Sequence, residues 1–255
     1  MRKNFHASAQ AEAQDFPVAW AEPGPKTFSG HAQHVANLSK PQPPASINGA
    51  ELFLPPNVYH PGIGLSSRFL VDALLNRPLG DSVLDLGCGS GFIGISLYRS
   101  GMALVLADIS DAALASAAEN LRRMGITAEV VSSDLFLGLG ERRFDTILFN
   151  PPLLDKSIEH DAEIALCDPN GSLLGRFLAD APDHLTAGRK IYFIASNLMN
   201  RGALLSGLEA YRYEIISSSL CAHSDVSRWL VQASPKRLQP CRPDALWQAP
   251  GRVAA

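Results

Sequence analysis

The chain has little of what metal sites, membrane spans and nucleic-acid surfaces require. Its four cysteines form no C-x-x-C pair and have no metal-ligand spacing, which favours a reduced intracellular protein without structural zinc. No stretch approaches the ~18 to 20 apolar residues that cross a bilayer, and the N-terminus has no apolar secretory core. Lys and Arg occur at most in pairs, and the formal net charge is −3. We therefore expect a cytoplasmic protein that binds no metal, no membrane and no nucleic acid.

The chain also lacks the motifs that reveal several enzyme classes. It has no Ser-His-Asp signature, no phosphate-binding lysine loop and no dense cluster of histidines or acids. Hydrolase, kinase and metalloenzyme chemistry therefore have no support in the sequence. The 255 residues are enough for one α/β domain with a sizeable core and a small extra segment.

A glycine-rich turn is the strongest positive signal. The apolar run 83–86 predicts a short strand, and the apolar run 92–97 predicts a helix. Between them, Gly87, Gly89 and Gly91 allow a tight turn and a close approach of the backbone to a ligand. A dinucleotide fingerprint differs, because its third glycine comes three residues after the second. We predict a site for a nucleotide-like cofactor.

Three aspartates stand beside the predicted strand ends. Asp85 lies just before the glycines, Asp108 ends the apolar run 104–107, and Asp134 follows the run 128–131. The carboxyl ends of parallel strands meet at one edge of a sheet, where side chains point into the ligand crevice. A carboxylate at that edge can accept both ribose hydroxyls, and Asp108 fits this role. A turn or N-cap residue is the alternative for Asp108 and Asp134.

Together these residues resemble the first motifs of the class I S-adenosylmethionine-dependent methyltransferases of the small-domain type. The resemblance covers roughly residues 57–234. It implies an α/β fold, a Rossmann-like sheet of seven strands with the last antiparallel, and S-adenosylmethionine as cofactor. It also implies that the Gly87–Gly91 backbone lies under the methionyl and ribose groups, that Asp108 binds the ribose and that Asp134 meets the adenine amino group. We assign Asp85 to the same cofactor site.

The predicted chemical centre is the run Asn150-Pro151-Pro152-Leu153, directly after the predicted strand 144–149. An asparagine oxygen can accept an amine proton and aim the nitrogen lone pair, while the prolines lock the backbone so that its carbonyls can help. The run resembles the N-P-P-aromatic motif of methyltransferases that act on amide or exocyclic base nitrogens. Leu153 replaces the aromatic residue that stacks on the flat acceptor there. We predict that Asn150 serves both cofactor and acceptor; a turn residue is the alternative.

The missing aromatic residue and the charge of −3 lead us to expect N-methylation of a small amine or amino-acid-like acceptor, in small-molecule metabolism. A protein acceptor is possible but less favoured. Three alternatives stay open. The first is cyclisation of S-adenosylmethionine to azetidine-2-carboxylate with release of methylthioadenosine. The second is methylation of a protein glutamine or a nucleobase nitrogen, and the third is a noncatalytic cofactor-binding partner of another enzyme.

Tyr59 and Asp168 complete the predicted catalytic set with Asn150 and Pro151. Tyr59 lies in a stretch that resembles the aromatic entrance segment before the core of small-domain methyltransferases. Asp168 lies in a loop that resembles the one closing over the acceptor, where it could bind a substrate ammonium. An ordinary turn is the alternative for each.

The chain divides into a predicted N-terminal accessory or lid segment, 1–56, and a predicted catalytic domain, 57–255. The first segment is rich in Ala, Gln, His and Pro, and its Asn48-Gly49 pair predicts a hairpin over 46–54. We also expect a short helix over 7–14. Further expected elements are a helix that begins at Ser66, helices over 112–124 and 173–185, and strands over 190–195, 213–219 and 228–233. We expect Ser110 to cap the helix over 112–124 and Gly125 to end it, with a buried stripe of Leu114, Ala117, Ala118 and Leu121.

Overall fold

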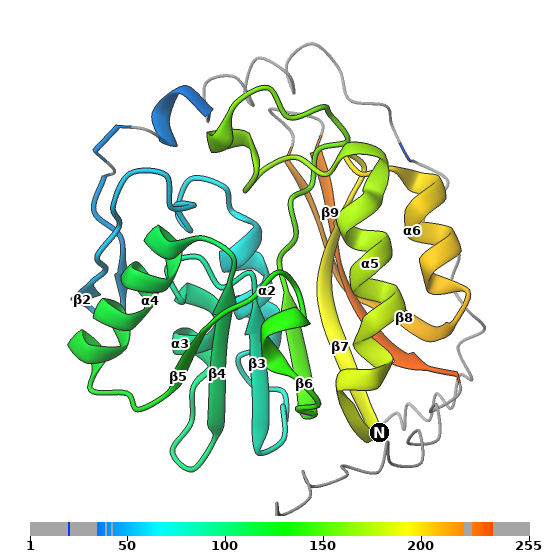
Figure 1. Cartoon of the computed structure of the whole chain (residues 1–255), viewed down its shortest axis with the longest axis horizontal. Helices are drawn as coiled ribbons and strands as arrows, with labels where there is room; N and C mark the ends of the chain where they lie inside the picture. Colours follow the sequence, from blue (N-terminus) through cyan, green and yellow to red (C-terminus); the bar gives the residue numbers. More distant parts are fainter. Residues whose placement is uncertain (1–19, 21–34, 39, 42, 222–225, 237–255) are drawn as a thin grey trace, which may run out of the picture.

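The computed structural model describes residues 20, 35–38, 40–41, 43–221 and 226–236. Its centre is a seven-stranded sheet with helices on both faces (Figure 1). The strands are β3 (Ser82–Leu86), β4 (Ala103–Asp108), β5 (Glu129–Ser132), β6 (Phe144–Phe149), β7 (Leu185–Ser196), β8 (Tyr211–Cys221) and β9 (Val226–Pro235). The helices are α2 (Ser66–Leu74), α3 (Phe92–Leu97), α4 (Asp111–Met124), α5 (Ser172–Asp180) and α6 (Arg201–Leu208). The short helix expected over 7–14 lies outside the described residues.

The strand order is β5-β4-β3-β6-β7-β9-β8. Strands β5 to β7 are parallel, whereas β9 is antiparallel to both of its neighbours. This arrangement confirms the predicted Rossmann-like sheet with an antiparallel last strand. The chain leaves β3 towards β5 and then returns to β6 on the other side of β3, so a ligand crevice is expected at the carboxyl ends of these strands.

Two hydrophobic clusters cover the two faces of the sheet. Alternate strand residues such as Leu84 and Phe193 pack against α5 and α6. Residues on the opposite face, such as Val83 and Leu148, pack against α2, α3 and α4. Side chains alternate between the faces of a strand, so near-continuous apolar runs are what a sheet covered on both sides requires.

The predicted hairpin belongs to the second of these clusters. It consists of β1 (Ser46–Ile47) and β2 (Ala50–Glu51), and Asn48 and Gly49 turn with φ angles of 50° and 84°. Ile47 is buried in the same cluster as α2 and α3. The hairpin is therefore packed on the sheet domain.

The ends of helix α4 lie where the sequence predicts, whereas its buried face differs from the prediction. The Ser110 hydroxyl caps its first turn, and Gly125 ends it with a φ of 64°, as predicted. Of the expected apolar stripe, Ala118 is exposed, whereas the polar Ser116 and Asn120 are fully buried. The buried face is partly polar because Ser116 and Asn120 form hydrogen bonds with the backbone of neighbouring segments.

Asn120 joins the segment after the hairpin to the glycine turn. Its Oδ1 accepts the Phe53 N–H at 2.6 Å, and its Nδ2 donates to the Ser90 carbonyl at 2.9 Å. Ser116 adds a hydrogen bond of 2.6 Å to the Phe53 carbonyl. These contacts fix the position of the glycine turn from the side of α4.

The remaining differences concern element ends. Strand β7 begins at Leu185, five residues earlier than expected. Helix α5 ends at Asp180, and Ala181–His184 continue as a 3₁₀ turn that contains Pro182, which cannot donate to the preceding turn. Among the described residues, no helix has the length and apolar character of a membrane span.

Candidate active site

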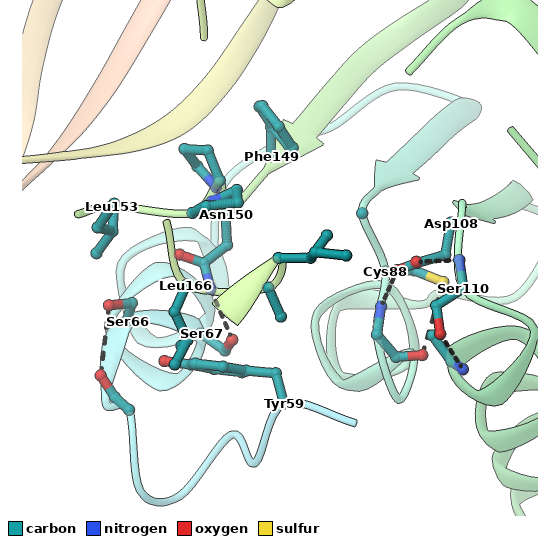
Figure 2. Close-up of a pocket in the computed structure, with 18 of the residues that line it drawn as sticks. Tyr59, Ser66, Ser67, Cys88, Asp108, Ser110, Phe149, Asn150, Leu153 and Leu166 are labelled. Atoms are coloured by element: carbon teal, nitrogen blue, oxygen red, sulfur yellow. Dashed lines mark hydrogen bonds between the residues drawn. The ribbon is translucent and has the colours of Figure 1, made fainter. Parts of the chain in front are cut away.

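A cavity of about 810 Å³ opens at the carboxyl edge of the parallel strands. It extends from the ends of β4 and β5 to the end of β6 and the start of β9. In Figure 2, Asp108 and Ser110 lie on one side of it, and Tyr59, Ser67 and Asn150 gather on the other. The cavity therefore has two ends with different chemistry, which correspond to the predicted cofactor and acceptor sites.

The glycine turn forms the floor between these ends. Gly87, Gly89 and Gly91 have φ angles of 62°, 54° and 76°, which residues with a Cβ rarely adopt. Gly87 and Gly89 line the cavity, whereas Gly91 does not: a Cβ there would meet Ile95 and Leu106 at 3.0 and 3.1 Å. A Cβ on Gly89 would meet nothing within 4 Å. Gly89 thus leaves space for a ligand, and Gly91 leaves space for the packing of α3.

Asp108 is positioned by the backbone around it. One carboxylate oxygen accepts the Gly89 N–H and the other accepts the Ser110 N–H, each at 2.9 Å. Burial raises the pKa of Asp108, and these hydrogen bonds oppose the rise. Each oxygen keeps a further lone pair, so the carboxylate can still accept from the hydroxyls of a ribose. The residues at this end fit the nucleoside part of S-adenosylmethionine.

Asp134 also lines the cavity, after the end of β5. Its Oδ2 pairs with the Arg176 guanidinium of α5 at 2.9 Å, and both side chains are partly exposed. The ion pair fixes the carboxylate while leaving its other oxygen for the predicted contact with an adenine amino group.

Asp85 is absent from the lining of the cavity. Its side chain is fully buried beneath the glycine turn, where Oδ2 accepts the Gly94 N–H at 2.8 Å and Oδ1 has no partner. Burial raises the pKa of Asp85 to about 7, opposed by the Gly94 hydrogen bond and increased by the charge of Asp108. Any contribution of Asp85 to cofactor binding therefore acts through the shape of the turn.

Asn150 stands at the other end of the cavity, directly after β6. Its Nδ2 donates to the Ser67 hydroxyl at 3.1 Å (Figure 2). Its Oδ1 is buried and has no hydrogen-bond partner. An unsatisfied buried acceptor costs about 1–3 kcal/mol, and a bound group that brings an N–H to this oxygen would recover that cost. No motif in the sequence marks Ser67.

The walls around Asn150 are largely aliphatic. Pro151, Pro152 and Leu153 line the cavity together with Leu166. The Leu153 N–H donates to the Leu166 carbonyl at 3.1 Å, which ties the run after β6 to the loop before α5. Of the loop before α5, the apolar residues Ile164, Ala165 and Leu166 line the cavity.

Asp168 is not brought to the cavity. Its two carboxylate oxygens accept the N–H groups of Leu173 and Leu174 at 2.8 and 3.0 Å, and the side chain is buried. Asp168 therefore caps the start of α5, which corresponds to the turn alternative in the sequence. Its carboxylate is not available to a substrate ammonium in this position.

Tyr59 does line the acceptor end, together with Ser66 and Arg228. Burial raises the pKa of Tyr59 to about 12, opposed by the positive charge of Arg228 and by a side-chain hydrogen bond with Ser66. A Cβ at Gly64 would collide with the Tyr59 hydroxyl, so this glycine makes room for the ring. Arg228 comes from β9, far along the chain from the other residues, and no motif marks it.

Comparisons with known proteins identify the family of the chain. Residues 51–212 match the model of the methyltransferase small domain family. A ribosomal RNA small subunit methyltransferase C of Alcanivorax borkumensis is 30% identical over 144 residues, which are 55% of this chain and 41% of that protein. A putative protein N5-glutamine methyltransferase of Methanocaldococcus jannaschii is 29% identical over 176 residues, 66% of this chain and 87% of that protein. The chain thus spans about two fifths of the first relative and most of the second.

The solved structures extend the agreement to the fold. The 16S rRNA N2 G1207 methyltransferase of T. thermophilus, in complex with AdoMet and guanosine, superposes with a TM-score of 0.55 at 24% identity. The match covers 78% of this chain and 52% of that one.

The same comparisons correct the expected acceptor. The two relatives carry names that give ribosomal RNA or protein glutamine as the acceptor. Our expectation of a small-molecule acceptor, of a role in small-molecule metabolism and of no nucleic-acid partner is therefore wrong. Net charge averages over the whole surface and does not identify the group that enters one cavity. The chain belongs to the methyltransferase small domain family.

Proposed function

We propose that this protein methylates the side-chain amide nitrogen of a glutamine residue in a protein acceptor. The observation that carries the proposal is the buried Asn150 Oδ1, which has no donor and lies at the end of the cavity opposite the ribose site. A primary amide offers two N–H donors, so one can satisfy this oxygen while the nitrogen stays in the cavity. The likeness to the putative protein N5-glutamine methyltransferase of Methanocaldococcus jannaschii, 87% of whose length is matched, supports the same acceptor.

The protein's own part in the reaction is to position the acceptor. The cofactor, when bound, supplies a methyl group on a positively charged sulfur. Ser67 holds the Asn150 amide in one orientation, so that Oδ1 accepts an N–H and aims the lone pair of the nitrogen. Leu153 and Leu166 exclude water from that end. Holding the two reacting atoms about 3–3.5 Å apart supplies much of the rate enhancement of such a reaction.

The rim of the cavity favours a protein acceptor over RNA. Ile63, Ile109 and Ile164 line the cavity and are 40%, 60% and 50% exposed. Exposed apolar residues gathered around a cleft are typical of a surface that contacts another protein. Phosphate recognition needs several Lys or Arg side chains, and among the described lining residues Arg228 alone is basic.

The test is methyl transfer from isotopically labelled S-adenosylmethionine to two acceptor pools, a ribosomal protein fraction and deproteinised ribosomal RNA. We expect label in protein, and peptide mass spectrometry should locate one methyl group on a glutamine side chain. Asn150→Ala should lower the rate about 100-fold, as expected when an acceptor is mispositioned, and should leave cofactor binding intact. Asn76→Ala, a change at an exposed asparagine outside the cavity, serves as the control.

Other outcomes would refute the proposal. Label confined to RNA would identify a nucleobase methyltransferase. Release of methylthioadenosine in the absence of any acceptor would identify the cyclisation reaction. Full activity of Asn150→Ala on protein would show that glutamine is held by other residues.

A further inference from the structure

Arg228 is the one basic side chain among the described residues that line the cavity. The ionisable acids of the lining are Asp108, Asp134 and Asp161. The first two are already bound to backbone N–H groups or to Arg176. The cavity thus carries a single positive charge that the cofactor assignments above leave without a function.

The fold brings this charge to the acceptor end. Strand β9 runs antiparallel to β7, and Arg228 pairs with Ser196 at the carboxyl end of β7. The Arg228 Nε donates to the Ser66 hydroxyl at 3.0 Å, and Ser66 is buried. Among the described residues no carboxylate lies within ion-pair distance of Arg228, and within that part of the chain its other guanidinium N–H groups have no hydrogen-bond partner.

The position of Arg228 relative to Asn150 suggests which anion this is. Ser66 holds Arg228 and the adjacent Ser67 holds Asn150, and consecutive Cα atoms are about 3.8 Å apart. Arg228 and Asn150 are therefore held by neighbouring residues at the start of α2, and both line the same cavity. S-adenosylmethionine carries its one carboxylate a few bonds beyond its sulfur, at the end opposite the ribose. A glutamine side chain carries no charge.

We propose that the Arg228 guanidinium, held in place by Ser66, binds the carboxylate of the methionyl group of S-adenosylmethionine. A guanidinium and a carboxylate form two parallel charge-assisted hydrogen bonds, which fix direction as well as distance. Arg228 would thereby set where the sulfur sits relative to Asn150. The inference concerns cofactor binding alone and does not depend on which acceptor is methylated.

The experiment compares cofactor products that differ in the carboxylate. Titration calorimetry gives the dissociation constants of S-adenosylhomocysteine, which has the carboxylate, and of 5′-methylthioadenosine, which lacks the amino-acid part. Arg228→Gln should weaken the binding of S-adenosylhomocysteine by about 10- to 100-fold, which is the effect expected for a hydrogen-bonded pair of charges. The dissociation constant of 5′-methylthioadenosine should not change. Arg212→Gln, at an exposed arginine of β8, is the matched control and should change neither.

Decarboxylated S-adenosylmethionine separates the carboxylate from the neighbouring ammonium. Its affinity should be insensitive to Arg228→Gln because it has nothing for the guanidinium to bind. Ser66→Ala keeps the charge of Arg228 and removes the hydroxyl that holds it. This variant should weaken the binding of S-adenosylhomocysteine by a smaller factor and leave the affinities of the other two ligands unchanged. This second variant provides the test if Arg228→Gln does not fold, as judged by its melting transition.

Two results would overturn the inference. An equal loss of affinity for all three ligands would mean that Arg228 maintains the shape of the cavity. Unchanged affinities combined with a raised KM for the acceptor would mean that the guanidinium binds a carboxylate or carbonyl group of the acceptor.

Discussion

The buried carboxyl group of Asp85 gives a prediction whose size follows from the structure. Asp85 is fully buried, with one oxygen bonded to the Gly94 N–H and the other unpartnered. Burial raises its pKa from 3.8 to about 7. The folded protein therefore keeps this proton over a range of pH in which the unfolded chain releases it.

The direction of the effect follows from proton linkage. Between pH 4 and pH 7 the folded state binds more protons at Asp85 than the unfolded state does, so the free energy of unfolding falls as the pH rises. Above pH 7 the loss is complete and stays constant. A pKa difference of about 3 units, at about 1.36 kcal/mol each, corresponds to a loss of about 4 kcal/mol as an upper value.

Asp85→Asn isolates this contribution. The amide oxygen can still accept the Gly94 N–H, and the side chain no longer ionises. Urea unfolding of both proteins without cofactor, from pH 4 to pH 8, should show the wild type losing about 4 kcal/mol relative to the variant. Titrations of groups that do not interact with Asp85 cancel in this difference. A difference that stays constant with pH, or that changes in favour of the wild type as the pH rises, would refute the reasoning.

Two further predictions concern the site. Gly89→Ala and Gly101→Ala place a Cβ at φ angles of 54° and 87° with nothing within 4 Å, so each should cost about 1–2 kcal/mol of stability. Only Gly89 lines the cavity, and calorimetry should find weaker S-adenosylhomocysteine binding in that variant alone; equal binding in both would place the cofactor elsewhere. Asp168→Ala removes the acceptor for two N–H groups of α5 and should cost about 1–2 kcal/mol in urea unfolding. Its KM for a protein acceptor should not change, whereas a raised KM would return Asp168 to the acceptor site.

Much of the fold was accessible from the sequence because its signals are local. Apolar runs bounded by glycines predicted the strands, and the hydroxyl of Ser110 and the backbone freedom of Gly125 predicted the ends of α4. The buried face of α4 was predicted less well. Asn120 reads as a surface residue in a helical pattern, and it is buried because the backbone of Phe53 and Ser90 needs its amide. Because these partners lie far from Asn120 in the sequence, the hydrophobic periodicity of the helix does not reveal them.

In the candidate site, too, the residues marked by local sequence signals were predicted and those placed by distant contacts were not. The glycine turn, Asp108 and Asn150 stand at predictable strand ends and line the cavity. Asp168 has the same local character, but its carboxylate serves the backbone of the next helix. Arg228 and Ser67 could not be found from the sequence, because their role depends on the sheet bringing β9 and α2 together.

The order of the last two strands also bears on how acceptor choice can change. Cys221 at the end of β8 pairs with Val226 at the start of β9, and Val226 lines the cavity. Insertions between two paired strand ends are generally tolerated because they leave the strand pairing and the core unchanged. Protein engineers could therefore insert a new recognition segment between these two strand ends, beside the cavity, while the glycine turn and Asp108 on the far side of the sheet are inherited unaltered.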